Sequence, residues 1–274
     1  MPQATVDGTV TLAPLLKWPG GKRILLKHLL PLVPEVFNRY YEPFIGGGAL
    51  FFAMQSPKAV LADKNQDLIN CYTQVRDYPE AVIAHLSRFK NTEEDYYAVR
   101  DTSPTDGAER AARLIYLTTL SFNGIHRVNL QGKFNVPYGH KRHLQPCDAA
   151  KIKAVSVALS SAYLLCDDFE AAVSDAQAGD LVYLDPPYTV AHGNNGFLKY
   201  NAKIFSWDDQ IRLAHVAGDL AKRGCRVLVS NAHHPSIQSL YQLFKAVEIS
   251  RPSVIAASGK HRRVVTECIF HNGE

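Results

Sequence analysis

Short apolar runs alternate with segments of helical period along this chain, and this alternation restricts the fold more than any other feature. The runs are RYYEPFIGGG, AVLADKN, DLVYLDPPY, CRVLVSNA and VVTECIF, and turn residues such as glycine, proline, aspartate or asparagine lie at or near their ends. In the intervening SWDDQIRLAHVAGDLAKRG, Ser206 is placed to cap a helix, Asp208 and Asp209 suit its first turn, and Gly224 follows its last turn. Strands that alternate with helices predict an α/β fold with a largely parallel sheet.

The middle of the chain departs from this alternation. From about residue 65 to residue 146 the pattern is mainly helical, with AERAARLIYLTTL as its clearest amphipathic run, and it is followed by the strand-poor SFNGIHRVNLQGKFNVPYGH. We therefore predict a domain of residues 65–146 inserted into a sheet domain formed by residues 1–64 and 147–274. A chain of 274 residues is long enough for one large domain with such an insertion.

Composition narrows the classes of protein without selecting one. No apolar run reaches the length that spans a membrane, and the N-terminus lacks the pattern of a secretion signal, so we expect a cytoplasmic protein with no membrane partner. The five cysteines are scattered and make no metal-ligand spacing with the histidines, so we expect free thiols and no metal. A net charge of +4, with basic clusters around residues 133–143 and 260–263, permits a polyanionic partner.

A strand followed by three glycines and a helix, YYEPFIGGGALFFAM, is typical of a loop that approaches a nucleotide-like ligand closely. Asp63 ends the next apolar run, where an acidic residue meets a ribose diol in nucleotide-binding folds; the alternative is an ordinary cap of a loop. Because FIGGG is not GxGxxG, the loop is not suited to a pyrophosphate, and S-adenosylmethionine is the candidate cofactor. The predicted contacts include Phe44, Gly46, Gly48 and Asp63.

A second glycine turn, LLKWPGGK, carries Lys17, Trp18 and Lys22. An aromatic residue and cations close to glycines favour a role in binding the carboxylate of a cofactor or a phosphate. The alternative is a structural turn that anchors a helix, with Trp18 packed in the core.

The run DLVYLDPPY places Asp185, Pro186, Pro187 and Tyr188 at the end of a predicted strand, where open α/β sheets bind ligands. A carboxylate and a carbonyl held by proline can both accept hydrogen bonds from an exocyclic amino group, while the tyrosine ring stacks on the base. This arrangement predicts positioning of an amino group for methyl transfer. The alternative is a turn that merely ends the strand. The following segment, residues 189–205, is predicted to be a mobile lid over a flipped base.

Several motifs together identify a family. LLKWPGGK, EPFIGGGALF, LADKNQDLIN, SFNGIHRVNLQGKFNVPYG, VYLDPPY and VSN occur in this order between about residues 15 and 270. In this combination the chain resembles the Dam-type DNA adenine-N6 methyltransferases of the alpha group, or D12 class. The resemblance implies a Rossmann-like, S-adenosylmethionine-dependent methyltransferase sheet with an inserted, mainly helical, DNA target-recognition domain.

The resemblance also implies roles for individual residues. The cofactor contacts are Trp18, Lys22, Asp63 and Asp185, and the catalytic residues are Asp185, Pro186, Pro187 and Tyr188. The DNA contacts are Lys17, which matches a lysine that reads the outer guanine of GATC, Phe122 in the place of an intercalating aromatic residue, Asn123, Ile125, Arg127 and Pro137. An aromatic wedge can fill the gap left by a flipped base, and an arginine can bond a guanine edge.

Two departures from the family pattern bear on the target sequence. Phe122 stands where tyrosine is common, and TTL at residues 118–120 replaces a more polar Asn-Arg pair. The methyl-transfer residues are unaffected. The choice between GATC and a related sequence therefore stays open.

We predict an enzyme that transfers a methyl group from S-adenosylmethionine to adenine N6 in double-stranded DNA after base flipping, with GATC as the expected target. The alternatives are another adenine-containing sequence, another amino group such as that of cytosine N4 or RNA, and a DNA-binding regulator with weak catalysis. A dinucleotide oxidoreductase is disfavoured by the missing GxGxxG. We expect a monomer that is encoded by a bacterium or phage and acts alone or beside a restriction nuclease.

Overall fold

The computed structural model describes residues 5–6, 9–10, 12–129, 131–189, 205–252 and 264–273 of the chain. The chain divides into two compact units, which are described separately. The first contains Met1–Lys27 and Ile45–Asp167, and the second contains His28–Phe44 and Asp168–Glu274. No helix within the described ranges is long and apolar enough to cross a membrane.

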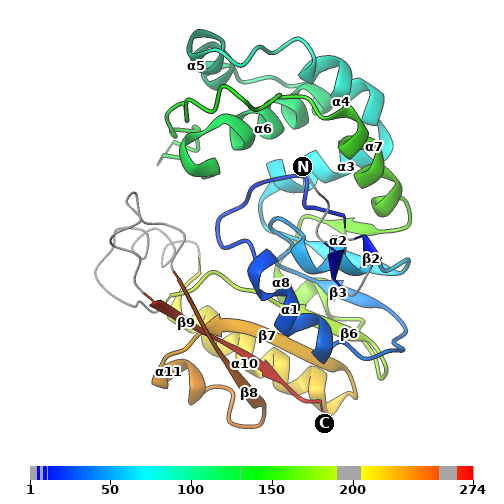
Figure 1. Cartoon of the computed structure of the whole chain (residues 1–274). Coiled ribbons are helices and arrows are strands. Elements are labelled where there is room, and N and C mark those ends of the chain that lie inside the picture. Colours follow the sequence, from blue (N-terminus) through cyan, green and yellow to red (C-terminus); the bar gives the residue numbers. More distant parts are fainter. Residues whose placement is uncertain are drawn as a thin grey trace. The chain divides into compact units, whose positions relative to one another are not determined.

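The first unit is mainly helical (Figure 1). Its longer helices are α3 (Gln66–Asp77), α4 (Pro79–Leu86), α5 (Glu93–Asp101), α6 (Gly107–Leu120) and α7 (Ala149–Leu159). Helix α6 packs against α3, α4 and α5, and its buried side chains include Leu114, Ile115 and Leu117. The predicted helical pattern of the middle of the chain is confirmed.

Polar side chains cap the N-termini of most of these helices. The side chain of Asn65 accepts hydrogen bonds from the backbone of Asp67 and Leu68 at α3, and Asp106 accepts one from Glu109 at α6. Such caps satisfy backbone N–H groups that have no partner within the helix.

The remaining elements of the first unit are short. Strand β4 (Ala59–Ala62) pairs in parallel with β5 (Tyr163–Leu165), and β1 (Thr5–Val6) pairs antiparallel with β2 (Thr9–Val10). The short helices are α2 (Ala49–Met54), η1 (Arg23–Leu25) and η3 (Phe122–Gly124), while α1 (Leu26–Leu29) and η2 (Leu30–Leu32) lead into the second unit.

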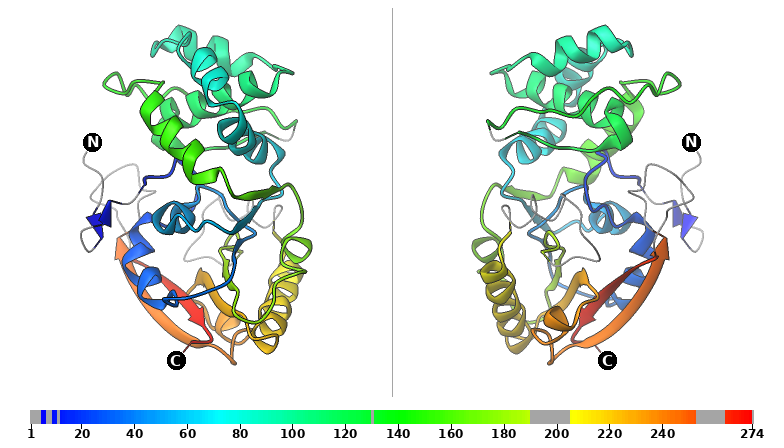
Figure 2. Two further views of the ribbon diagram at one scale, coloured as in Figure 1. Left: turned by 90° about the vertical axis from the view of Figure 1, so that its right-hand side faces the viewer. Right: turned by 90° about the vertical axis from the view of Figure 1, so that its left-hand side faces the viewer.

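Within the described residues, the second unit contains five paired strands in the order β3-β6-β7-β9-β8. They are β3 (Tyr40–Glu42), β6 (Leu181–Leu184), β7 (Arg226–Ala232), β9 (Val264–His271) and β8 (Lys245–Pro252). Strands β3, β6 and β7 are parallel, whereas β9 runs antiparallel to both β7 and β8. Helix α10 (Trp207–Lys222), yellow in Figure 2, packs against β7; the short helices are α8 (Phe169–Ala172) and α11 (Pro235–Gln238).

The α/β fold is confirmed, and each of the five predicted apolar runs forms a strand. Strands β5 and β8 were not predicted. The described parallel pairs are β4–β5, β3–β6 and β6–β7, whereas β9 pairs antiparallel with both β7 and β8. Helix α10 begins as expected: the hydroxyl of Ser206 accepts from the backbone of Asp209, whose side chain accepts in return from the backbone of Ser206. Gly224 follows its end with a positive φ of 87°.

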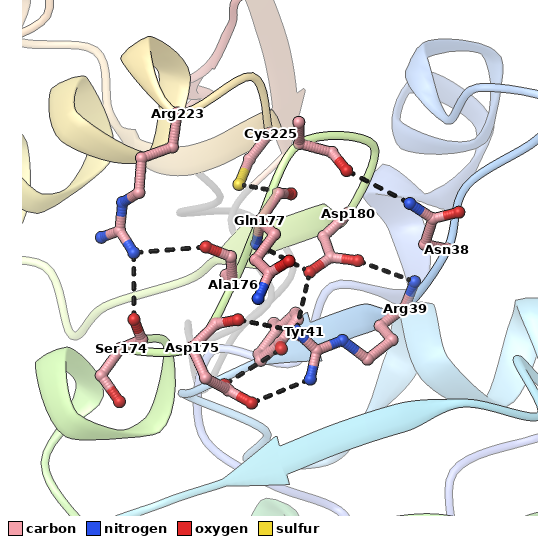
Figure 3. A network of polar contacts seen from close by, with 11 residues as sticks. Asn38, Arg39, Tyr41, Ser174, Asp175, Ala176, Gln177, Asp180, Arg223 and Cys225 are labelled. Carbon is pink, nitrogen blue, oxygen red and sulfur yellow. Dashed lines mark hydrogen bonds and ion pairs between the residues drawn. The ribbon is translucent and has the colours of Figure 1, made fainter.

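A polar network fixes the beginning of β6 (Figure 3). The guanidinium of Arg39 lies 2.8 Å from the carboxylate of Asp175 and 3.2 Å from that of Asp180, whose side chain is only 2% exposed. The backbone N–H groups of Arg39 and Gln177 also donate to Asp180, at 3.1 and 2.9 Å. The strand that leads to Asp185 is therefore anchored at its start.

Candidate functional site

The glycine loop of the first unit has a conformation that requires glycine. Gly46 and Gly48 have positive φ angles of 45° and 66°. A Cβ atom on Gly46 would lie 2.9 Å from Cδ1 of Trp18, and one on Gly48 would lie 2.9 Å from Cε2 of Phe52. Positive φ and the close approach of the Trp18 and Phe52 side chains together explain why glycine is required at these two positions.

Asp63 follows β4 and holds this loop. One carboxylate oxygen accepts from the backbone N–H of Gly46 at 3.2 Å, and the other accepts from that of Asn65 at 3.0 Å. The hydroxyl of Tyr72 donates to the carbonyl of Gly46 at 2.8 Å. Burial raises the pKa of Asp63, although the two N–H groups oppose this effect. Asp63 therefore shapes the loop, and its oxygens retain the capacity to accept from a ribose hydroxyl.

The side chain of Lys22 closes the second glycine turn, LLKWPGGK. The ammonium of Lys22, which is only 6% exposed, donates to the carbonyl of Gly20 at 2.8 Å, and the N–H of Gly21 donates to the carbonyl of Trp18 at 3.1 Å. The indole of Trp18 stacks on the imidazole of His126, with ring centroids 4.5 Å apart. These contacts hold the turn together, but Trp18 is half-buried rather than packed in the core, and the cofactor role of the turn remains a prediction.

The predicted DNA-contacting residues come together in the first unit. Phe122 is 46% exposed and its N–H donates to the carbonyl of Pro137 at 2.9 Å. A Cβ atom on Gly124 would lie 2.6 Å from Cδ of Lys17, so the Lys17 stem covers the backbone of the recognition segment, residues 122–127. Arg127, which is exposed, donates to the side-chain oxygen of Asn135 at 2.8 Å.

The other members of this group differ in exposure. Lys17, Asn123 and Pro137 are exposed, whereas Ile125 is half-buried. Asn123 has a positive φ of 55°. Their surface position fits a role in binding, which remains a prediction for each of them.

The end of α6 is occupied by internal contacts. The hydroxyl of Thr118 is buried and donates to the carbonyl of Leu114 at 2.8 Å. The ammonium of Lys141 donates to the carbonyl of Ser121 at 2.9 Å, and burial, together with the charge of Lys17, lowers the pKa of Lys141 to about 8. Thr118 therefore serves the core of this unit.

The Asp-Pro-Pro-Tyr segment of the second unit directly follows β6, as predicted. Pro186 is buried, and Asp185, Pro187 and Tyr188 are half-buried. The side-chain amide of Gln210, on α10, donates to the carbonyl of Pro187 at 3.2 Å. The segment therefore has a specific side-chain partner on the neighbouring helix.

Gln210 was missed from the sequence, as was the partner that orients it. The amide nitrogen of Asn231 donates to the side-chain oxygen of Gln210 at 2.9 Å, and the oxygen of Asn231 accepts from the N–H of Ala232 at 2.8 Å. Asn231 belongs to the VSN motif on β7. A signal for Gln210 was present, because it shares the apolar face of α10 with Leu213, Ala214, Ala217 and Leu220.

Phe44 lies in an aromatic cluster of the second unit. Its ring stacks on Phe169 at 5.3 Å and meets the edge of Phe205 at 5.6 Å. The guanidinium of Arg212 lies 4.1 Å from the centre of the Phe169 ring. The predicted cofactor contact of Phe44 remains a prediction.

Other expectations concern metals, thiols and the lid. The described ranges contain no group of three histidine, cysteine, aspartate or glutamate residues that could hold a metal ion. All five cysteines are free, as predicted. Residues 190–204 of the predicted lid, and the basic cluster at residues 260–263, lie outside the described residues.

Comparison with known proteins agrees with these features. A family model described as D12 class N6 adenine-specific DNA methyltransferase matches residues 18–255. The chain is 40% identical over 273 residues to the Type II methyltransferase M1.LlaDCHI of Lactococcus lactis subsp. cremoris, covering 96% of each chain. It is 34% identical over 274 residues to the Type II methyltransferase M.MjaIII of Methanocaldococcus jannaschii, covering 91% of this chain and 95% of that protein. It is 32% identical over 257 residues to a DNA adenine methylase of Salmonella typhimurium, covering 91% of each chain.

Proposed function

The chain belongs to the D12 class of N6 adenine-specific DNA methyltransferases, and from this premise we propose that it uses S-adenosylmethionine, flips the target adenine out of duplex DNA and acts at GATC. We further propose that it is a monomer in solution and acts on DNA in the cytoplasm. The observation that carries the proposal is the Asp-Pro-Pro-Tyr segment at the end of β6, with the Pro187 carbonyl hydrogen-bonded to Gln210.

The first unit fits the proposed cofactor. Gly46 and Gly48 form a tight loop at positive φ, packed against Trp18 and Phe52, and Asp63 offers carboxylate oxygens beside it. A sulfonium methyl group, which S-adenosylmethionine supplies when bound, is already activated for transfer. Trp18, Lys22 and Asp63 are the residues proposed to hold this cofactor.

The second unit supplies the acceptors for the amino group. In the proposed reaction the carboxylate of Asp185 and a proline carbonyl accept hydrogen bonds from the two N–H groups of adenine N6. These two hydrogen bonds direct the lone pair of the nitrogen toward the methyl group. A nitrogen–carbon bond forms as the sulfur–carbon bond breaks, and the proton lost from nitrogen afterwards passes to Asp185 or to water. Tyr188 is proposed to stack on the base. Asp185 thus acts mainly by positioning.

The recognition segment supports the proposed target. Phe122 is exposed and can fill the space left by a flipped base, while Arg127 and Lys17 offer donors for guanine edges in the major groove. The Dam-type motifs of the sequence are the ground for proposing GATC, and the likeness to proteins named Type II methyltransferases leaves room for another adenine-containing sequence.

The proposed target is tested by incubating the protein with a labelled methyl donor and matched duplexes that contain or lack GATC. We expect label only in the GATC duplex. Equal labelling of both would refute the target sequence. Titration with S-adenosylhomocysteine and with NAD tests the cofactor separately, and saturable binding of NAD alone would refute the methyl donor.

Asp185→Ala tests the mechanism. The substitution removes one of the two proposed acceptors, so we expect transfer to fall below detection while GATC binding stays within about threefold of wild type. A gel-shift titration and a methylation assay measure the two quantities on the same preparation. Loss of both activities would instead indicate that Asp185 supports the fold.

A further inference from the structure

Gln210 is a buried polar side chain on an otherwise apolar helix face. It is 0% exposed and lies among Leu213, Ala214 and Ala217 on the side of α10 that packs in the second unit. A primary amide is costly to bury unless its donor and acceptor are both used. Its contacts therefore show what the amide does at this position.

The direction of the hydrogen bonds follows from Asn231. Its oxygen accepts from the backbone N–H of Ala232 at 2.8 Å, so its nitrogen is the atom that donates to Gln210, at 2.9 Å. The Gln210 oxygen is thereby occupied as an acceptor, and its nitrogen donates to the carbonyl of Pro187 at 3.2 Å. The three groups form a relay from β7 through α10 to the segment after β6.

The relay restrains the one backbone torsion that the ring of Pro187 leaves free. The ring of Pro187 fixes φ, so the free torsion at this residue is ψ, which rotates the peptide plane carrying the Pro187 carbonyl and the Tyr188 nitrogen. A hydrogen bond to that carbonyl holds the plane. Since the plane leads directly into Tyr188, it also determines the direction in which the tyrosine side chain leaves the backbone.

We infer that Gln210 is a positioning residue for methyl transfer: by holding the Pro187 carbonyl it sets the orientation of Tyr188 against the target base. This inference rests on the proposed function. Asn231 supports Gln210 in the same role, which gives the asparagine of VSN a physical explanation.

The test uses two substitutions of nearly the same shape in the full-length protein. Gln210→Met removes the donor and the acceptor, and Gln210→Glu removes the donor when the carboxylate is ionised. At about pH 8 we expect both to lower the single-turnover methylation rate at least about tenfold, because the Pro187 carbonyl, and with it the orientation of Tyr188, is no longer held. The dissociation constants for S-adenosylhomocysteine and for a GATC duplex should stay within about twofold of wild type.

The pH profile separates positioning from simple destabilisation. A protonated carboxylic acid has one donor and one acceptor, so protonation of Gln210→Glu restores the relay, and burial raises its pKa above the ordinary value for glutamate. The rate of Gln210→Glu relative to Gln210→Met should therefore rise as pH falls from about 8 to about 6. The ratio cancels pH effects common to both proteins.

Asn272→Leu is a matched control. The Asn272 amide donates to the carbonyl of Cys225 at 2.8 Å and accepts from the N–H of Val227 at 2.9 Å, so it is also a side-chain amide with two bonds, at the opposite end of β7. We expect its single-turnover rate to stay within about twofold of wild type. An equal loss in this variant would refute a specific role for Gln210.

Two further outcomes would overturn the inference. One is a wild-type rate in folded Gln210→Met, and the other is a ratio of the two variants that does not change with pH. If Gln210→Met does not fold, the methylation rate of Gln210→Glu relative to wild type is used instead. This ratio should likewise rise as pH falls, and a constant ratio would overturn the inference. Absence of methylation by wild type would instead refute the proposed function, so the two failures are distinct.

Discussion

The stack of Trp18 on His126 should make the first unit sensitive to acid. The His126 imidazole lies 4.5 Å from the Trp18 ring and meets the edge of the Phe134 ring at 5.6 Å. Burial lowers the pKa of His126 from its ordinary value of 6.5 to about 4. The neutral ring is therefore the form that belongs in the folded state.

The sign and size of the effect follow from these two pKa values. The unfolded chain binds the proton first as pH falls, so the stability is fully present above 6.5 and is lost progressively toward 4. The complete loss corresponds to about 3 kcal/mol in the free energy of unfolding. Between about pH 7 and about pH 5 the expected loss from His126 alone is about 2 kcal/mol.

His126→Phe isolates this contribution, because phenylalanine keeps an aromatic ring beside Trp18 but has no proton to bind. Urea unfolding should be followed by the fluorescence of Trp18 in a Trp207→Phe background, since these are the two tryptophans of the chain. The loss of stability between the two pH values should be about 2 kcal/mol smaller in His126→Phe. His143→Asn, at an exposed position, serves as the control and should behave as wild type. Parallel losses in wild type and His126→Phe would refute the argument from burial.

The remaining predictions concern DNA recognition and the second unit. Arg127→Ala should relax discrimination at one base pair by about 1–3 kcal/mol, measured by competition among duplexes with single base changes. A uniform loss across all sequences would reassign Arg127 to a phosphate contact. Arg39→Met should lower the free energy of unfolding of the second unit by about 2 kcal/mol, because it leaves the buried carboxylate of Asp180 without its cation. Urea unfolding followed by Trp207 fluorescence measures this loss, and an unchanged midpoint would show that the network does not stabilise the unit.

Dense apolar runs made much of the fold predictable. The four residues of β6 and most residues of β7 are buried, so their sequences consist almost entirely of side chains suited to a sheet interior. Strand β5 has only three residues, none of which is buried, and it gives no such signal. Strand β8 mixes charged and apolar residues, which is typical of a strand at the edge of a sheet.

The site was predictable only where its residues are close together in the sequence. The spacing of Asp185–Tyr188 and of the glycine loop indicates the chemistry locally. The partners of these motifs come from elsewhere: Gln210 is separated from Pro187 by 23 positions, and His126 reaches Trp18 from a distant loop. Such partners depend on the packing of helices and strands, which the sequence pattern does not specify residue by residue.

The Arg39–Asp180 contact has a consequence for synthesis of the chain. The two residues are 141 positions apart, so β3 leaves the ribosome about 10 s before the strand that pairs with it. Tyr40 and Tyr41, both fully buried in the folded protein, have no β6 to pair with during that interval. Helices α3 to α6 of the first unit, which lie within residues 66–120, can meanwhile pack on one another. The second unit is therefore expected to fold last. Strand β3, which stays unpaired until then, is the segment that we expect a chaperone to protect most.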